Sequence, residues 1–218
     1  MNNLTDQQKG SLLAFVAVIF ITPDSLFIRL SNIDTWGLVF YRGIIPFFTV
    51  FIGMLLIYKL NFFKILFSSG YHGIIYVITF SVTNITFVVS IQNTNVANTL
   101  VMIATAPMLS AILSGIFLNE RPDKSTWISI IITLFAVFFI FYDSLGIGNF
   151  YGDILGFITA VGLAVGAVTI RSAKSKNLVP AAVIGKLFVA MFALLFIESF
   201  MLVKKDLIIV PLMCILCV

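Results

Sequence analysis

The chain has 218 residues, of which 61% are hydrophobic and 10% are charged, and its mean hydropathy is +1.14. Soluble domains contain roughly 45–50% apolar and about 25% charged residues. A soluble domain of this length has too small an interior to hide so much apolar surface. The composition therefore excludes ordinary soluble enzymes, disordered chains and disulfide-stapled secreted domains. It predicts an all-α, polytopic membrane protein, since the long unbroken apolar runs lack the alternation of a transmembrane β-barrel.

The formal net charge is +4. The basic residues are scattered between apolar runs, as membrane topology requires, so a nucleic-acid partner is not expected. Cys214 and Cys217 have the C-x-x-C spacing of some metal and redox sites, but no histidine or second cysteine pair accompanies them. We therefore interpret them as small residues of an apolar segment and expect neither a metal nor a cofactor.

Seven stretches of the sequence approach the length of about 20 apolar residues that a membrane-crossing helix needs. They are residues 10–30, 36–58, 71–91, 96–118, 126–142, 152–171 and 180–203. Polar or turn-forming residues separate these predicted spans. A last apolar run, residues 207–218, is too short to cross the membrane.

The lysines and arginines predict the orientation of the spans. With a cytoplasmic N-terminus, three basic residues lie outside and eight lie inside. The outer three are Arg29, Lys204 and Lys205, and the inner eight are Lys9, Lys59, Lys64, Arg121, Lys124, Arg171, Lys174 and Lys176. The first span is too long for a cleaved signal peptide and lacks the flanking sequence of one. The chain is thus expected to be a multi-pass protein of the cell inner membrane.

A shift of 142 residues aligns the first span with the sixth. Five positions are then identical, and the pairs are Gly10–Gly152, Leu13–Leu155, Phe15–Phe157, Ile28–Ile170 and Arg29–Arg171. The second copy starts after five spans, an odd number, so it has the opposite orientation, as in many secondary transporters. Residues 1–145 are the predicted first repeat, and residues 146–218 are an incomplete second repeat of a ten-span protein. A natural seven-span protein with a re-entrant tail is the alternative.

Several motifs resemble a known family. The segment from Asn98 through Ala106-Pro107, then Leu118-Asn119-Glu120-Arg121-Pro122 and Trp127, resembles the fourth and fifth spans of EamA-type drug/metabolite transporters. Tyr41-Arg42-Gly43 is similar to the start of that family's second span. The resemblance implies five plus five spans, a cytoplasmic N-terminus and a carrier of small metabolites, often an exporter. It does not specify the substrate.

Ionisable residues inside a membrane usually face a cavity or a partner. Asp24 and Arg42 each lie six residues from the outer end of their span, which is a depth of about 9 Å. Antiparallel neighbouring spans would bring them level, so we predict an ion pair or a shared polar site. A substrate or coupling-ion site and a structural pair that braces two helices are equally consistent with the sequence.

Two further charges lie in the seventh predicted span. Lys186 either extends its long side chain to the cytoplasmic interface or faces the cavity and attracts an anionic substrate. Glu198 either couples transport to protons, if desolvation raises its pKa, or reaches water at the outer interface. The two residues are roughly 18 Å apart along a helix and cannot pair directly.

Polar residues recur on one face of the third and fourth spans, where they either hydrogen-bond between helices or line a cavity. Those of the third are Thr79, Thr83, Thr86 and Ser90, and those of the fourth are Asn95, Asn98, Thr99 and Thr105, with Met102 on the same face. Packing is favoured for the hydroxyls. A cavity position is favoured for Asn84 and Asn98, because a buried amide has more groups to satisfy.

Three prolines fall inside spans, and proline removes a helical hydrogen bond. Pro107 is expected to kink the fourth span, and Pro23 and Pro46 are candidates for the same role beside Asp24 and Arg42. Freed carbonyls at mid-membrane often line a transporter cavity.

The sixth span carries Gly162-x-x-x-Gly166, which predicts close helix packing either within the chain or across a homodimer.

Polar residues near the cytoplasmic ends of the spans are assigned to the interface. We expect Glu120 and Arg121 to form an exposed ion pair and His72 to lie at the interface.

The sequence contains no nucleophile elbow, P-loop, HExxH or dinucleotide fingerprint, so an enzyme is not predicted. The interpretation is a secondary carrier of a small metabolite, with Asp24, Arg42, Asn84, Asn98 and Lys186 as candidate contacts. The alternative is a membrane sensor or structural subunit on the same scaffold.

Overall fold

A computed structural model describes residues 6–59, 61–120, 122–142, 149–174, 176–198, 200 and 206–216. This part of the chain consists of helices joined by short connections. The helices are α1 (Asp6–Ile21), α2 (Asp24–Leu30), α3 (Thr35–Tyr58), α4 (Asn61–Ser68), α5 (Tyr71–Asn93), α6 (Val96–Ile103), α7 (Ala106–Phe117), α8 (Lys124–Phe141), α9 (Phe150–Ala173), α10 (Val179–Ala193) and α11 (Asp206–Leu216). The all-helical fold predicted from composition is confirmed.

Side-chain caps set the start of three long segments. Asp34 accepts a hydrogen bond from Gly37 N at the start of α3. Asn95 and Asn149 accept bonds from Ala97 N and Tyr151 N at the starts of α6 and α9. Each cap satisfies a backbone donor that the first helical turn leaves without a partner.

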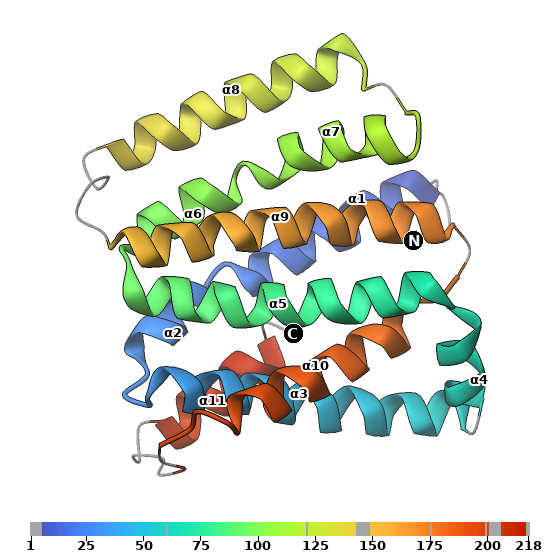
Figure 1. Cartoon of the computed structure of the whole chain (residues 1–218), viewed down its shortest axis with the longest axis vertical. Coiled ribbons are helices and arrows are strands. Elements are labelled where there is room, and N and C mark those ends of the chain that lie inside the picture. The colour runs from blue at the N-terminus through green and yellow to red at the C-terminus, as the bar shows by residue number, and fades with distance from the viewer. Residues whose placement is uncertain are drawn as a thin grey trace.

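The long helices α3, α5, α8 and α9 lie with their axes roughly aligned (Figure 1). Helix α5 occupies the middle of the bundle, where it packs along α9 on one side and against α10 on the other. Helix α10 also packs against α3, while α6 and α7 pack against α9. Helices α5 and α9 are antiparallel, because the start of each contacts the end of the other. His72 at the start of α5 contacts Ser172 at the end of α9, and Ser90 near the end of α5 contacts Gly152 near the start of α9.

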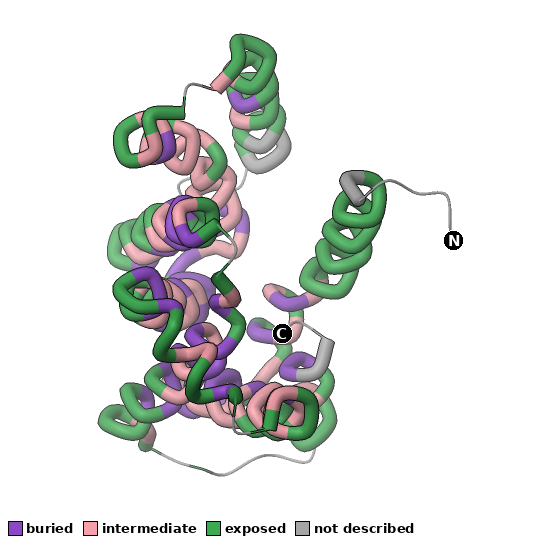
Figure 2. The backbone as a smooth tube through the Cα atoms, turned by 90° about the vertical axis from the view of Figure 1, so that its right-hand side faces the viewer, coloured by how far each residue is buried: buried purple, intermediate pink, exposed green. Residues whose placement is uncertain are grey.

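Helix α1 is exposed along its whole described length. Every residue from Gln8 to Thr22 is exposed, and Figure 2 shows α1 set apart from the main stack of helices. Its side chains are mostly apolar, as expected for a surface that faces lipid. Burial begins where α2 starts, at Asp24 and Ile28.

Within the described residues, five helical stretches are long and apolar enough to cross a membrane. They are Gln8–Leu30, Thr35–Tyr58, Tyr71–Asn93, Val96–Phe117 and Phe150–Ala173. They correspond to the first four and the sixth of the predicted spans. The fifth predicted span corresponds to α8, in which the described apolar stretch Lys124–Ala136 is shorter.

The prediction for the seventh span was wrong at its end, because α10 stops at Ala193 rather than continuing to residue 203. The next amides, of Leu195 and Phe196, donate to carbonyls three residues back, which tightens the chain into a turn. Phe196 stacks on Trp36 of α3, with ring centroids 4.7 Å apart. Hydropathy alone cannot distinguish this aromatic packing from a continued helix.

The C-terminal apolar run forms α11, a helix of 11 residues that packs against α2 and α3. Asp206 at its start is fully buried, and its carboxylate accepts a hydrogen bond from Asn32 N at 3.1 Å. Cys214 is buried in the core with Val210 and Met213. Its expected companion, Cys217, lies outside the described residues.

Candidate functional site

The predicted pair of Asp24 and Arg42 is present. Asp24 is the first residue of α2, because the chain breaks at Pro23, and Arg42 lies in the second turn of α3. Both terminal nitrogens of the guanidinium contact the carboxylate, with Nη2 at 2.9 Å from Oδ2. The two residues are only 5% and 6% exposed. This two-point contact is the geometry that best offsets the cost of burying both charges.

Lys186 faces the interior of the bundle, so the interpretation that it reaches the cytoplasmic interface was wrong. It is 6% exposed, and its Nζ donates to Oδ1 of Asn84 at 2.8 Å. Asn84 donates its own amide hydrogen to Phe80 O, which orients Oδ1 toward the lysine. The ammonium also lies 5.3 Å from the centroid of the Phe80 ring, a cation–π distance. Helix α10 packs against both α3 and α5, and this packing encloses the lysine within the bundle.

A cavity of about 540 Å³ lies beside these groups. Its lining comes from both the first and the second predicted repeat. The lining residues are Val18, Ile21, Thr22, Asp24, Ser25, Arg42, Thr83, Asn84, Phe87, Leu100, Ile103, Thr159 and Leu163. We call it the central cavity. It is mostly apolar, with an ion pair, an amide and a few hydroxyls on its wall, as is typical of small-molecule sites.

The charges near the central cavity do not cancel. Asp24 and Arg42 both line it and neutralise each other, while Lys186 adds a second buried basic group one hydrogen bond away, through Asn84. Arg42 also lies over the ring of Phe87, at 5.8 Å from its centroid. When Lys186 is protonated, this region carries a positive excess in a setting of low polarity, where a charge acts strongly on any ligand.

Asn98, the fifth candidate contact, lies away from the central cavity. Its Nδ2 is 3.2 Å from Oδ1 of Asp153 at the start of α9, and Thr94 donates to the same oxygen at 2.6 Å. Among the described residues, the buried Oδ1 of Asn98 has no hydrogen-bond partner. Sequence reasoning missed Asp153 and Thr94. A carboxylate in the first turn of a predicted span was the available signal, but it fits equally well with a favourable helix dipole.

Two of the four hydroxyls of the third span join helices, as favoured from the sequence, whereas Thr83 lines the central cavity and Thr79 bonds to carbonyls of its own helix. Thr86 bonds to Thr159 of α9, and Ser90 bonds to Thr99 of α6, each at 2.8 Å. Ser90 also donates to the carbonyl of Gly152 at 2.7 Å. Thr159 in addition lines the central cavity and was not among the predicted residues, because its partner was not visible in the sequence.

The glycine face of α9 packs against α5 inside the same chain. A side chain at Gly152 would come within 3.0 Å of Thr94, and one at Gly156 would come within 3.1 Å of Ser90. Gly162 lies against Thr83 in the same way. The structure thus accounts for this smooth face without a second copy of the chain.

The three prolines differ in effect. The first span is interrupted at Pro23, and the fourth is divided into α6 and α7 just before Pro107. In contrast, α3 continues without interruption through Pro46. Proline lacks the amide that would bond to the residue four positions earlier, so the carbonyl of Ile103 loses that partner beside the central cavity.

Glu198 lies beyond the end of α10 and is exposed. It lines a separate cavity of about 350 Å³ together with Asp34, Trp36 and Tyr151. This position agrees with the interpretation that Glu198 reaches water at the outer interface. The desolvation required for a proton-coupling carboxylate is not found there.

Two predictions for the end of the bundle where α9 terminates differ from the structure. Glu120 forms an exposed ion pair with Arg171 of α9, at 2.6 Å, whereas its expected partner Arg121 lies outside the described residues. His72 is buried rather than interfacial, and its Nε2 is 3.2 Å from Oγ of Ser172. Both changes arise because α9 packs antiparallel to α5 and brings its last turn to this end.

The comparison with protein families gives one match. Residues 8–142, more than half of the chain, match the model of the EamA-like transporter family. The chain belongs to the EamA-like transporter family. It is therefore a multi-pass membrane protein of a transporter family, in agreement with the resemblance of its fourth and fifth spans. Comparisons with curated proteins and with solved structures found no match.

Proposed function

We propose that this EamA-family chain is a secondary carrier that exports a small metabolite across the inner membrane by alternating access. The observation that carries the proposal is the central cavity with its Asp24–Arg42 pair. It lies between helices of both predicted repeats, the usual place of the substrate site in carriers built from inverted repeats. The N-terminus is cytoplasmic in this proposal, as the distribution of basic residues predicts.

The substrate class is an organic anion. The positive excess near the cavity, from Arg42 and Lys186 against Asp24, favours a negatively charged ligand in a low-dielectric site. Asn84 is then a positioning residue for Lys186, because it accepts the lysine hydrogen bond and lines the cavity itself. The apolar remainder of the wall would contact the carbon skeleton of the substrate.

Discontinuous helices support the same site. Helix α2 starts at Asp24 after the break at Pro23, and α6 ends at Ile103 before the break at Pro107. In transporters, such breaks present backbone groups to the substrate and provide points at which helices can bend. The energy source in this proposal is exchange or a proton gradient.

A second pair of glycines supports the two-repeat organisation. Gly43 of α3 and Gly185 of α10 are 142 residues apart, the shift that aligns the first span with the sixth. A Cβ atom at Gly43 would lie 2.7 Å from Ala190 N, and one at Gly185 would lie 2.9 Å from the Phe80 ring. Both positions are points of close helix contact. Repeats at 1–145 and 146–218 therefore remain our proposal for the domain organisation.

Counterflow in proteoliposomes tests the function. Proteoliposomes that contain the purified chain are loaded with excess unlabelled compound. The uptake of labelled dicarboxylates, sugar phosphates, neutral sugars and cationic amines is then measured under both directions of pH gradient. We expect saturable uptake of at least one anionic compound. A complete lack of saturable flux across this panel would overturn the proposal and favour a sensor or structural subunit.

A further inference from the structure

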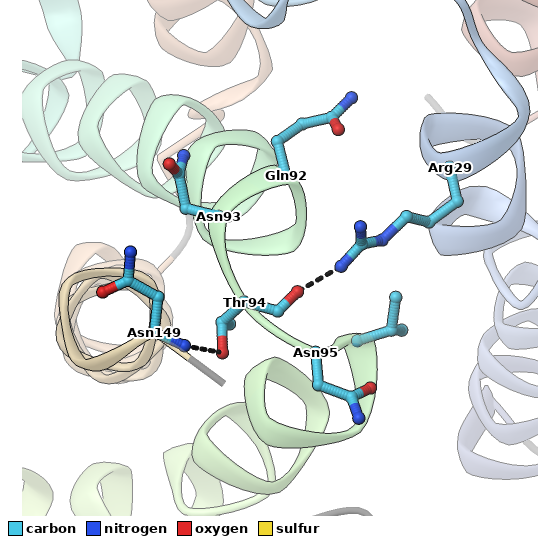
Figure 3. A pocket seen from close by; sticks show the side chains of 7 residues that line it. Arg29, Gln92, Asn93, Thr94, Asn95 and Asn149 are labelled. Atoms are coloured by element: carbon cyan, nitrogen blue, oxygen red, sulfur yellow. Dashed lines mark hydrogen bonds between the residues drawn. The ribbon is translucent and has the colours of Figure 1, made fainter. Parts of the chain in front are cut away.

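A second polar cavity, of about 510 Å³, lies at the end of the bundle where α5 passes into α6. Its wall contains one cation and four carboxamides around a central threonine, as Figure 3 shows. These residues are Arg29, Gln92, Asn93, Thr94, Asn95 and Asn149. None of them lines the central cavity. We call this second site the Thr94 cavity.

Arg29 gives the Thr94 cavity its charge. Its guanidinium donates to the carbonyl oxygen of Thr94, and it is the one charged group among the residues that line the cavity. A guanidinium has five N–H donors in a planar fork that suits carboxylate and phosphate groups. The carboxylate of nearby Asp153 is already bonded to Thr94 Oγ1 and to Asn98.

Two helix starts add to this positive character. Asn95 and Asn149 cap α6 and α9, and both residues line the Thr94 cavity. In each cap the side-chain oxygen accepts a backbone hydrogen bond, from Ala97 N and from Tyr151 N. The capping oxygen of Asn149 is thereby engaged, which leaves its amide hydrogens as the groups it can offer to a ligand. The helix dipoles also favour an anion at this point.

Helices α2 and α6 each contribute residues to both the Thr94 cavity and the central cavity. Helix α2 carries Asp24 in the central cavity and Arg29 in the Thr94 cavity, and five residues of helix span about 7.5 Å. Helix α6 likewise starts with Val96 at the Thr94 cavity and reaches Leu100 and Ile103 at the central one. Two sites so placed lie one after the other along the bundle.

We propose that the Thr94 cavity is an outer anion subsite, which holds the carboxylate or phosphate group of a metabolite between the central cavity and the outer solution. Arg29 is the recognition residue of this subsite. The inference rests on the proposed function for its place on the transport route. The binding of an anion to the cavity is independent of transport and is tested without any flux.

Charged thiol reagents measure the potential in the cavity. A variant lacking Cys214 and Cys217 receives Val96→Cys, because Val96 lines the Thr94 cavity and its side chain makes no capping bond. The rates of modification by an anionic and a cationic methanethiosulfonate of similar size are then compared. We expect the anionic reagent to be favoured, and Arg29→Gln to reduce the rate ratio about fivefold, the effect of one unit charge several ångströms away in water. Arg29→Lys should retain most of the ratio.

Tyr151→Cys is the matched control. Tyr151 lies at the same end of the bundle but lines the neighbouring cavity with Asp34 and Glu198, where the cationic reagent should be favoured. Arg29→Gln should leave the rate ratio at this position nearly unchanged. Equal changes at both positions would indicate a general structural effect and would overturn the proposal.

Protection by ligands completes the test. Succinate and inorganic phosphate are added separately to the Val96→Cys protein in phosphatidylcholine nanodiscs, with glycerol as the neutral control. We expect at least one anion to slow modification at Val96→Cys and to lose this effect in Arg29→Gln, and the protecting anion identifies the group bound. A lack of protection by both anions would overturn the subsite. Protection without any counterflow would support the subsite and contradict only the carrier proposal.

Discussion

Lys186 Nζ donates a 2.8 Å hydrogen bond to Asn84 Oδ1, and this bond joins α10 to α5 at the wall of the central cavity. The lysine comes from the second predicted repeat and the asparagine from the first. A charged contact between the two repeats beside a cavity is a natural place for a substrate to change how the repeats pack against each other. The first prediction concerns this lysine.

Lys186→Met should reduce counterflow of an anionic substrate at least tenfold, because it removes a buried cation from the edge of the central cavity. Lys186→Arg retains the charge and should retain part of the flux. Lys124→Met, at the exposed start of α8, is the control and should transport normally. Unchanged flux in Lys186→Met would contradict the assignment of an anionic substrate.

Asp24→Asn should destabilise the protein by about 3–5 kcal/mol, because it leaves the guanidinium of Arg42 buried without its counter-charge. The double variant Asp24→Arg with Arg42→Asp should recover much of this loss. The free energy of unfolding is measured by titration with sodium dodecyl sulfate. If the double variant folds but does not transport, the pair has a role in substrate binding beyond bracing α2 against α3.

Glu120→Gln provides the comparison for the buried pair. Glu120 and Arg171 are 2.6 Å apart, but their side chains are 44% and 64% exposed. Exposed pairs are screened by water, so this variant should change the free energy of unfolding by less than about 1 kcal/mol. A loss as large as that of Asp24→Asn would show that charge removal at any position destabilises this protein.

Gly43→Ala should destabilise the bundle by about 1–3 kcal/mol, since the added methyl group would lie 2.7 Å from Ala190 N and 2.8 Å from Lys186 O. These are backbone atoms, so α3 and α10 must move apart. Gly53→Ala in the same helix is the matched control, because a Cβ atom there has no neighbour within 4 Å. The control should be neutral or slightly stabilising, as alanine favours helix. Equal stabilities in the same detergent titration would be evidence against this close contact.

Pro107→Ala should leave the fold intact but slow transport severalfold. The alanine amide can donate to Ile103 O and join α6 and α7 into one continuous helix, which removes a point of bending beside the central cavity. Pro180→Ala is the control, because Pro180 lies in the first turn of α10, where proline costs little. Thermal stability and counterflow are measured together. Normal flux in a folded Pro107→Ala protein would exclude a role for this break.

Most of the fold follows from local properties of the sequence. The apolar runs predicted an all-helical membrane protein, and the breaks near Pro23 and Pro107 fall at residues whose backbone chemistry opposes helix. The end of the seventh span was not predictable in this way. The turn after Ala193 is held by the stacking of Phe196 on Trp36, and those two residues are far apart in the sequence.

The candidate site was likewise predictable from the sequence only in part. The ion pair of Asp24 and Arg42 was predictable, because equal depth in two neighbouring antiparallel spans follows from residue counting. Counting cannot place Lys186 or Asn98, since the direction of each side chain depends on which helix lies beside it. The structure directs Lys186 to Asn84, and it places Asn98 with Asp153 and Thr94 at the end of the bundle.

The sequence by itself determined that this is a helical membrane protein, the rough extent of the first four and the sixth of its spans, and the few charges that lie within them. These properties depend on transfer of side chains from water to lipid, which is nearly additive along the chain. Only the tertiary structure decided which of those charges meet, and that the hydroxyl and glycine faces of α5 and α9 pack together within one chain. Such contacts are set by the packing of helices that are distant in sequence, and no local pattern encodes them.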